Sequence, residues 1–215
     1  MFQPEVTLID YGIGNLLSVQ RGLEHCGVKV VVTSDPERVF SAARVILPGV
    51  GAFSVGMQEL GRRDLDAAVR EVANRGSPIL GICLGMQLLL DESDEFGTTN
   101  GLGLIPGRII PVPEVDTTGV PHRVPHIGWN ALIQPPHCAS WQGTILGDIN
   151  SGETVYFVHS YMACPVDTTH RIADCLYGGI PIAAVISREN VIGCQFHPEK
   201  SGETGLRVLR QFLLL

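Results

Sequence analysis

Residues 78–90 of the chain, Pro-Ile-Leu-Gly-Ile-Cys-Leu-Gly-Met-Gln-Leu-Leu-Leu, combine a buried strand, a tight turn and the first turns of a helix. Gly81 and Gly85 stand two residues either side of Cys83, which is the layout of a nucleophile elbow with sulfur as the nucleophile. A strained strand-to-helix turn leaves no room for side chains at these two positions. The helix N-terminus favours a thiolate, and adjacent N–H groups can bind an oxyanion. Taken alone, the stretch is also compatible with a buried structural cysteine.

Short apolar strands alternate with helical segments ahead of this stretch. Strands are predicted at 6–10, 28–33 and 45–47, and helices at 16–26, from residue 34 onward and at 60–74. Gly27 is expected to end the first helix, and Ser34-Asp35-Pro36-Glu37 has the composition of a helix start. This alternation predicts right-handed βαβ units and a parallel sheet.

The pattern changes after about residue 100. Short apolar runs are separated by Gly, Pro and Asn, which predicts antiparallel strands and hairpins, with a turn at 188–190. A final helix is predicted at 206–215, with Leu206, Leu209 and Leu213 on its apolar stripe. No linker or repeat interrupts the chain. We therefore expect a single α/β domain over residues 1–215, with a mixed, mostly parallel central sheet flanked by helices and antiparallel hairpins in the C-terminal half.

The composition excludes several classes of function. A net charge of −7 with no basic run argues against a nucleic-acid-binding protein. No window approaches ~18 consecutive apolar residues, and the N-terminus lacks a secretory signal pattern. The six cysteines are scattered without a CxxC pair, which predicts reduced thiols, a cytoplasmic location and no metal site. The Gly12-Ile13-Gly14 loop lacks the third glycine of a dinucleotide-binding motif, so it is interpreted as a tight turn.

A thiol nucleophile needs a base, and His197 is the best placed of the seven histidines. It directly follows the last apolar strand, and functional groups collect at the carboxyl ends of parallel strands. Glu199, two residues on, can fix the tautomer of His197 and support its imidazolium form. The segment Pro48-Gly49-Val50-Gly51 follows the third strand and can present N–H groups to an oxyanion at the same edge.

These three motifs together resemble the class I, triad-type glutamine amidotransferases. Within that superfamily, the stretches 10–16, 125–130 and 156–161 resemble the glutaminase subunits of imidazole glycerol phosphate synthase. The resemblance runs from about residue 6 to the last helix. The loops at 115–119 and 135–142 depart from the family pattern.

The resemblance implies roles for matching residues. Cys83 corresponds to the nucleophile, His197 to the general base and Glu199 to the residue that orients His197. The oxyanion hole would be formed by Leu84 and the segment Gly49, Val50 and Gly51, and the resemblance implies a flip of the Gly49-Val50 peptide to supply the donor. The glutamine pocket would be lined by Gln87, Glu95, His159, Ser160 and Tyr161.

The resemblance also implies a partner and no cofactor. Glutamine would be hydrolysed through a thioester, and the ammonia would pass to a cyclase subunit with a (β/α)₈ barrel, forming a heterodimer. Asn15, Trp129 and Lys200 match positions that face this partner. Trp129 is open to two interpretations, an exposed interface anchor or a core residue.

Three other functions compete with this interpretation. The chain could be the glutaminase of another synthesis (anthranilate, guanylate, carbamoyl phosphate or pyridoxal phosphate), a catalytically silent subunit that binds a partner, or a stand-alone cysteine hydrolase. An intact set of Cys83, His197 and Glu199 argues against the silent subunit. The stretches around Trp129 and His159 favour this glutaminase over the others.

Overall fold

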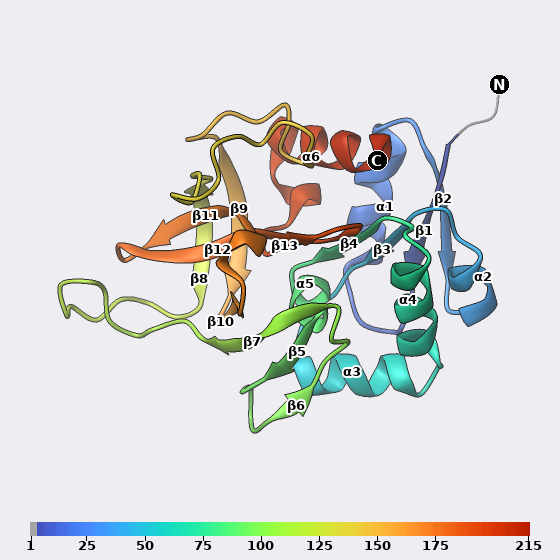
Figure 1. The fold of residues 1–215 in the computed structure, drawn as a ribbon, viewed down its shortest axis with the longest axis horizontal. Coiled ribbons are helices and arrows are strands. Elements are labelled where there is room, and N and C mark those ends of the chain that lie inside the picture. The colour runs from blue at the N-terminus through green and yellow to red at the C-terminus, as the bar shows by residue number, and fades with distance from the viewer. Residues whose placement is uncertain (1–3) are drawn as a thin grey trace.

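A computed structural model describes residues 4–215, and a seven-stranded sheet forms its centre (Figure 1). The strands lie in the order β11 (Arg171–Tyr177), β12 (Ile180–Arg188), β13 (Val191–Cys194), β4 (Ile79–Ile82), β3 (Val45–Leu47), β1 (Glu5–Ile9) and β2 (Lys29–Thr33). Neighbours from β13 to β2 pair in parallel, and β12 runs antiparallel to both of its neighbours. The prediction of a mixed, mostly parallel sheet is confirmed.

Helices cover both faces of this sheet. Helices α1 (Leu16–His25) and α6 (Gly202–Leu214) lie on one face, and α3 (Phe53–Gly61), α4 (Leu65–Asn74) and α5 (Leu84–Leu88) lie on the other (Figure 1). The short α2 (Pro36–Phe40) packs against α4. Each face has its own apolar core, one around α1 and α6 and one around α3, α4 and α5. Burial of both sheet faces explains why the central strands are apolar throughout.

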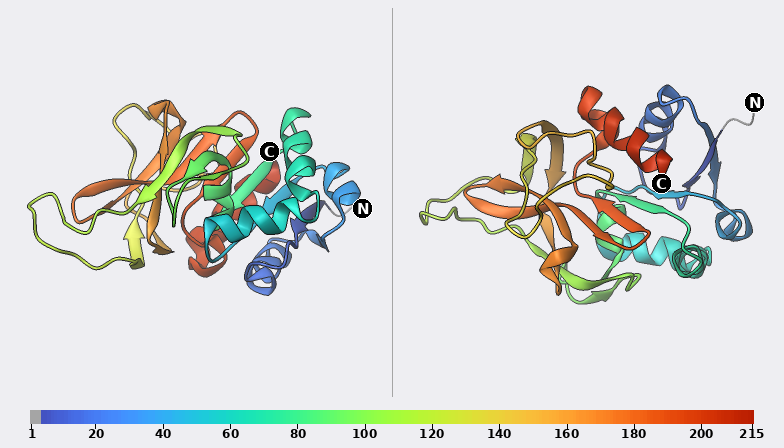
Figure 2. Two further views of the ribbon diagram at one scale, coloured as in Figure 1. Left: turned by 90° about the horizontal axis from the view of Figure 1, so that it is seen from below. Right: turned by 45° about the horizontal axis from the view of Figure 1, so that its top comes forward.

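Two smaller β units lie beside the central sheet, a mixed four-stranded sheet and an antiparallel ribbon. One sheet has the order β10 (Tyr161–Pro165), β7 (Ile105–Pro111), β5 (Leu90–Ser93) and β6 (Thr99–Asn100). The other unit is a two-stranded ribbon of β8 (His126–Ala131) and β9 (Thr154–His159). Single 3₁₀ turns, η1 (Thr168–His170) and η2 (Pro198–Lys200), complete the secondary structure. Figure 2 shows the long connection near residues 112–125 projecting from the end opposite the N-terminus.

Several local predictions are confirmed. Gly27 follows the end of α1 with φ +84°, a left-handed conformation that favours glycine. Helix α2 begins at the predicted place, although its cap is Asp35, whose carboxylate accepts a hydrogen bond from the Glu37 N–H (3.0 Å). A turn joins β12 to β13 at Glu189, as predicted.

Other boundaries differ from the predictions. The helix predicted at 60–74 begins only at Leu65, as α4, because Asp64 adopts a left-handed conformation (φ +56°) that separates it from α3, which ends at Gly61. The helix after Cys83 ends at Leu88, and strand β5 starts at Leu90. Helix α6 starts earlier than predicted.

The buried face of α6 also differs from the predicted stripe. It consists of Gly205, Val208, Leu209 and Phe212, so Leu206 and Leu213 lie beside it and remain partly exposed. No helix among residues 4–215 is long and apolar enough to cross a membrane. All six cysteines are free.

Candidate active site

The stretch around Cys83 has the predicted strand–turn–helix geometry. Cys83 lies between β4 and α5 with φ +54° and ψ −110°, a conformation that costs energy for any residue with a side chain. A Cβ on Gly81 would lie 2.6 Å from the Gly85 carbonyl oxygen, and one on Gly85 would overlap the Leu47 carbonyl. Both glycines are therefore required by close backbone packing. The Cys83 N–H donates to the Cys194 carbonyl (2.8 Å), which fixes the turn to β13.

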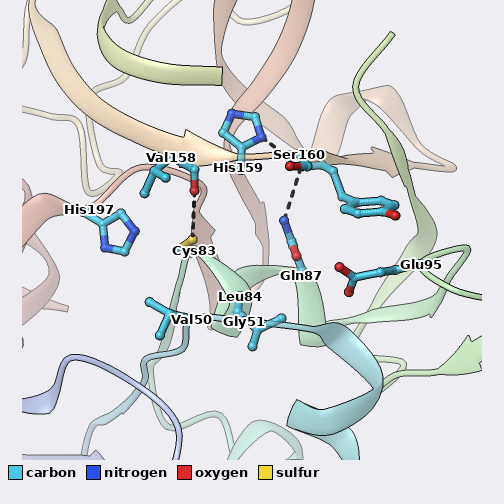
Figure 3. A pocket seen from close by; sticks show the side chains of 11 residues that line it. Val50, Gly51, Cys83, Leu84, Gln87, Glu95, Val158, His159, Ser160 and His197 are labelled. Carbon is cyan, nitrogen blue, oxygen red and sulfur yellow. Dashed lines mark hydrogen bonds between the residues drawn. The ribbon is translucent and has the colours of Figure 1, made fainter. Parts of the chain in front are cut away.

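His197 lies at the start of η2 with Glu199 directly behind it. The Nδ1 of His197 is 2.8 Å from Oε1 of Glu199, and both side chains are almost completely buried. A carboxylate oxygen accepts a hydrogen bond, so Nδ1 carries a proton. The other ring nitrogen, Nε2, is buried and has no hydrogen-bond partner among residues 4–215. Figure 3 shows His197 beside Cys83 at one end of the pocket.

The surroundings of His197 favour its charged form. Burial alone would lower its pKa, but interactions with the Cys83 sulfur and the Glu199 carboxylate outweigh burial and raise the pKa of His197 to about 9. An imidazolium at this position can stabilise a neighbouring thiolate and can return a proton to a leaving group.

Cys83 and His197 open onto a cavity of about 310 Å³ (Figure 3). Nine further residues line it: Val50, Gly51, Leu84, Gln87, Glu95, Val158, His159, Ser160 and Tyr161. The structure thus brings together ten of the residues predicted for catalysis, the oxyanion hole and the glutamine pocket. Glu199 lies behind His197, and Gly49 lies behind Val50, outside the lining.

The segment from Pro48 to Gly51 packs tightly against the start of α5. The hydroxyl of the fully buried Tyr11 donates to the Pro48 carbonyl (2.7 Å). Burial, with a smaller contribution from Cys83, raises the pKa of this phenol far above its usual value, so it stays a donor. A Cβ on Gly49 would overlap the Tyr11 hydroxyl and lie 3.0 Å from the Leu84 Cβ. The lack of a side chain on Gly49 lets this segment approach the nucleophile.

Gln87 and Glu95 occupy the other end of the cavity. The Gln87 Nε2 donates to the Tyr161 carbonyl (3.3 Å) and to Oε1 of Gln195 (3.0 Å). The Glu95 carboxylate accepts from the Phe53 N–H at the start of α3 (2.5 Å), and Figure 3 shows it turned toward Gln87. A polar end with a carboxylate can hold an ammonium group.

Two residues near Cys83 were missed by sequence reasoning. Gln195 is fully buried and donates through Nε2 to the Cys83 sulfur (3.7 Å), and the Val158 carbonyl accepts from the same sulfur (3.8 Å). The only signal for Gln195 in the sequence is a polar residue inside the apolar run 191–196. Val158 contributes only its backbone carbonyl, so its residue type in the sequence does not indicate this contact.

The three residues predicted to face a partner are all exposed. Asn15 precedes α1, Lys200 ends η2, and Trp129 on β8 has 56% of its surface exposed. The core interpretation of Trp129 is therefore wrong. Its ring packs edge-on against Tyr156 of β9 (6.1 Å between centroids), and Ile127 on the same strand is also exposed (59%).

Comparison with known proteins identifies related chains. Residues 7–215 match the family described as glutamine amidotransferase class-I. The chain is 50% identical over 208 residues to imidazole glycerol phosphate synthase subunit HisH 1 of Legionella pneumophila strain Lens, covering 97% of this chain and 98% of the relative. It is 43% identical to the HisH subunit of Bacillus cereus strain ATCC 10987, covering 96% of this chain and 93% of the relative.

Solved structures share the fold at lower identity. A structure titled as PurLQS from Thermotoga maritima matches with a TM-score of 0.71 at 20% identity, covering 99% of both chains. A structure titled as a glutamine amidotransferase also matches with a TM-score of 0.71 at 16% identity, covering 97% of this chain and 99% of the other.

Proposed function

The chain belongs to the class-I glutamine amidotransferase family, and from this premise we propose that it is the glutaminase subunit of an imidazole glycerol phosphate synthase. It is a glutamine-hydrolysing enzyme of histidine biosynthesis. We infer that residues 1–215 form one type 1 amidotransferase domain. The observation that carries the proposal is the pairing of His197 with Glu199 beside Cys83 in a chain half identical to a HisH subunit.

In the proposed reaction, Cys83 attacks the side-chain amide carbon of glutamine. His197 accepts the thiol proton through Nε2, the nitrogen that has no other partner among residues 4–215. Glu199 holds the opposite nitrogen and stabilises the imidazolium. His197 then protonates the departing amine, so ammonia leaves and a γ-glutamyl thioester remains on Cys83. Water, deprotonated by His197, releases glutamate and restores the thiol.

The oxyanion of each tetrahedral intermediate would be bound by backbone N–H groups. One donor would be the N–H of Leu84, the residue after the nucleophile. It lies at the start of α5, where the helix dipole favours negative charge. The second would come from Gly49, Val50 or Gly51. Close packing of Gly49 on Leu84 supports this pairing of donors.

The far end of the cavity suits the amino-acid end of glutamine. We propose that Glu95 binds the substrate ammonium, and that Gln87 and the backbone of 159–161 bind its carboxylate and hold its chain. The hydrogen bond from Gln87 Nε2 to the Tyr161 carbonyl supports the view that these groups form one wall of the cavity.

The ammonia has to reach a second subunit unprotonated, because ammonium is not a nucleophile. We propose a (β/α)₈-barrel cyclase as that subunit, forming a cytoplasmic heterodimer with this chain. Asn15, Trp129 and Lys200 are proposed as contacts, and the exposure of Trp129 supports its role as an aromatic anchor. The cyclase would use the ammonia to form imidazole glycerol phosphate and an aminoimidazole carboxamide ribonucleotide.

The test is to mix the purified chain with the cyclase of its own organism and measure glutamate release with and without the nucleotide substrate. We expect slow hydrolysis by the chain alone and strong activation by the liganded cyclase. The barrel subunits or synthases of other glutamine-dependent pathways serve as controls. Activation by one of those controls, and none by the cyclase, would assign the chain to a different synthesis.

A further inference from the structure

The wall of the glutamine pocket opposite α5 is the turn from β9 to β10. Its carbonyl groups carry the contacts to the catalytic helix: Val158 accepts from the Cys83 sulfur, and Tyr161 accepts from Gln87 Nε2. The Tyr161 carbonyl also accepts from Nδ1 of His159 (2.9 Å; Figure 3). The position of this wall therefore depends on how the His159 ring is held.

The hydrogen bonds around His159 fix which nitrogen carries a proton. A carbonyl oxygen can only accept, so Nδ1 of His159 is protonated and Nε2 is an acceptor. That acceptor lies 3.0 Å from Nδ1 of His126, which must therefore be the donor. Nε2 of His126 is then an acceptor, and Asn130 Nδ2 lies 3.4 Å from it. One directed chain of hydrogen bonds runs from Asn130 through two imidazoles to the pocket wall.

This assignment requires both imidazoles to be neutral, and their surroundings make them so. Both rings are buried, with 2% of His126 and 5% of His159 exposed. Burial, helped by the nearby His122, lowers the pKa of His126 to about 4. Burial also lowers the pKa of His159 to about 4, although its bond to the Tyr161 carbonyl acts in the opposite direction.

The His126 ring is held between two other rings. It stacks on Phe157 of β9 (4.9 Å between centroids, 20° between planes) and on Tyr177 of β11 (4.0 Å, 28°). Because these rings come from two other strands, the imidazole has one position and its Nδ1–H has one direction. The donor to His159 is therefore preorganised before any substrate binds.

We propose that His126 is a positioning residue for glutamine binding: its Nδ1–H holds His159 in the orientation and tautomer that place the Tyr161 carbonyl and the wall of the pocket. This inference rests on the proposed glutaminase function. His126 touches neither the pocket nor a reacting atom, and it acts through His159. Without the donor, His159 Nε2 is left buried and unpaired, and its ring is free to turn away from the Tyr161 carbonyl.

Two substitutions separate the hydrogen bond from the stacking. His126→Phe keeps a ring between Phe157 and Tyr177 but has no donor, whereas His126→Asn loses the ring and keeps an amide nitrogen at the place of Nδ1. In the complex with the cyclase, we expect His126→Phe to raise the KM for glutamine about tenfold, the effect of one unpaired buried acceptor, with a smaller change in kcat. We expect His126→Asn to stay near the wild-type KM. His122→Phe is the matched control, because the His122 ring also contacts Tyr177 (4.6 Å between centroids) but its Nε2 lies against the Pro113 carbonyl and not against His159.

The inference is overturned if His126→Phe binds glutamine as the wild type does, or if both His126 variants lose binding equally. If His126→Phe does not fold, His126→Leu serves as the second variant without a donor, with the same expectation.

A second readout does not depend on glutamine hydrolysis. Nitrogen chemical shifts of His159 in the free subunit report its tautomer. We expect the Nδ1–H form in the wild type and in His126→Asn, and a mixture of tautomers in His126→Phe. An unchanged single tautomer in His126→Phe would overturn the inference. A wild-type complex that fails to hydrolyse glutamine would overturn the proposed function, while the tautomer measurement would still decide the role of His126.

Discussion

The parallel sheet and the β8–β9 ribbon contribute different kinds of group to one pocket. The sheet supplies the groups proposed to react: Cys83 follows β4, His197 and Glu199 follow β13, and the segment from Gly49 follows β3. These three strands are neighbours and end at one edge. The ribbon supplies His159 and carries Trp129 on its outer side, with no reacting group. The groups proposed to react thus follow strands of the doubly covered sheet, whereas the ribbon contributes His159 to the pocket and Trp129 to the outer surface.

The largest expected effect comes from removing the nucleophile from the sheet side. Cys83→Ala should lower glutamine hydrolysis by about 10⁴-fold or more, because no other group can form the thioester. Synthesis from added ammonia should continue in the complex, since the ribbon and the partner are untouched. Glutamate release and ammonia-dependent product formation measure the two activities. Cys138→Ala is the control, and residual wild-type hydrolysis in Cys83→Ala would mean that the nucleophile lies elsewhere.

The next largest effect is expected from Glu199, which follows strand β13 of the sheet. Glu199→Gln should lower kcat by about 10²- to 10⁴-fold, because the amide cannot stabilise the His197 imidazolium and favours the wrong tautomer. The pKa of His197 should fall from about 9 toward its ordinary value, shifting the pH profile of kcat/KM. Glu203→Gln on the exposed side of α6 is the matched control. An unchanged pH profile in Glu199→Gln would show that Glu199 does not set the charge of His197.

A smaller effect is expected from the outer side of the ribbon. Trp129→Ala should weaken association with the cyclase by about 2 kcal/mol, or ~30-fold in Kd, as for an aromatic interface anchor. Thermal stability should barely change, because the side chain is exposed. Titration calorimetry measures the Kd, and Val166→Ala, at another exposed apolar residue, is the control. Equal affinities for wild type and Trp129→Ala would place the interface on another surface.

The smallest expected effect is on the pH dependence of stability, and it comes from His126 and His159 on the inner side of the ribbon. His126 and His159 have pKa values of about 4 when folded and near 6.5 when unfolded, so the unfolded chain binds more protons as the pH falls. Each should remove about 1 kcal/mol from the free energy of unfolding between pH 7 and pH 5.5. His197 acts in the opposite sense, because its pKa is raised, so its contribution is full below pH 6.5 and lost as the pH rises through 9.

Comparing the wild type with His126→Phe isolates the contribution of His126. When both proteins are unfolded in urea at pH 7 and at pH 5.5, the His197 contribution is the same in each and cancels in the difference. The decline from pH 7 to pH 5.5 should be about 1 kcal/mol smaller in His126→Phe. An identical decline in both proteins would mean that His126 is not held neutral by the fold.

The same division explains what the sequence could predict. On the sheet side, the groups lie within short motifs: Gly81 and Gly85 flank Cys83, and Glu199 is two residues from His197. Alternation of strands and helices then predicts that these motifs meet at one edge. The break at Asp64 was missed because a left-handed residue inside a periodic apolar run leaves no mark on the pattern.

On the ribbon side, the important relations are long-range. His126 and His159 are 33 residues apart and meet only because β8 and β9 pair in one register. The segment Tyr161–Pro165 forms strand β10 although it is short and ends in proline, a pattern that does not by itself predict a strand. Apolar alternation also could not decide whether Trp129 faces the core or solvent. Pairing partners and the outward face of a two-stranded ribbon depend on the assembled fold, so local pattern could not supply them.

The left-handed backbone of Cys83 has a consequence for the natural history of this chain. Holding a residue with a side chain at φ +54° costs about 1–3 kcal/mol, and glycine would relieve that strain. The most stable sequence for this turn is therefore not the reactive one. A copy of the gene released from selection for activity would be expected to lose its thiol early, and the turn would gain stability as its chemistry disappeared.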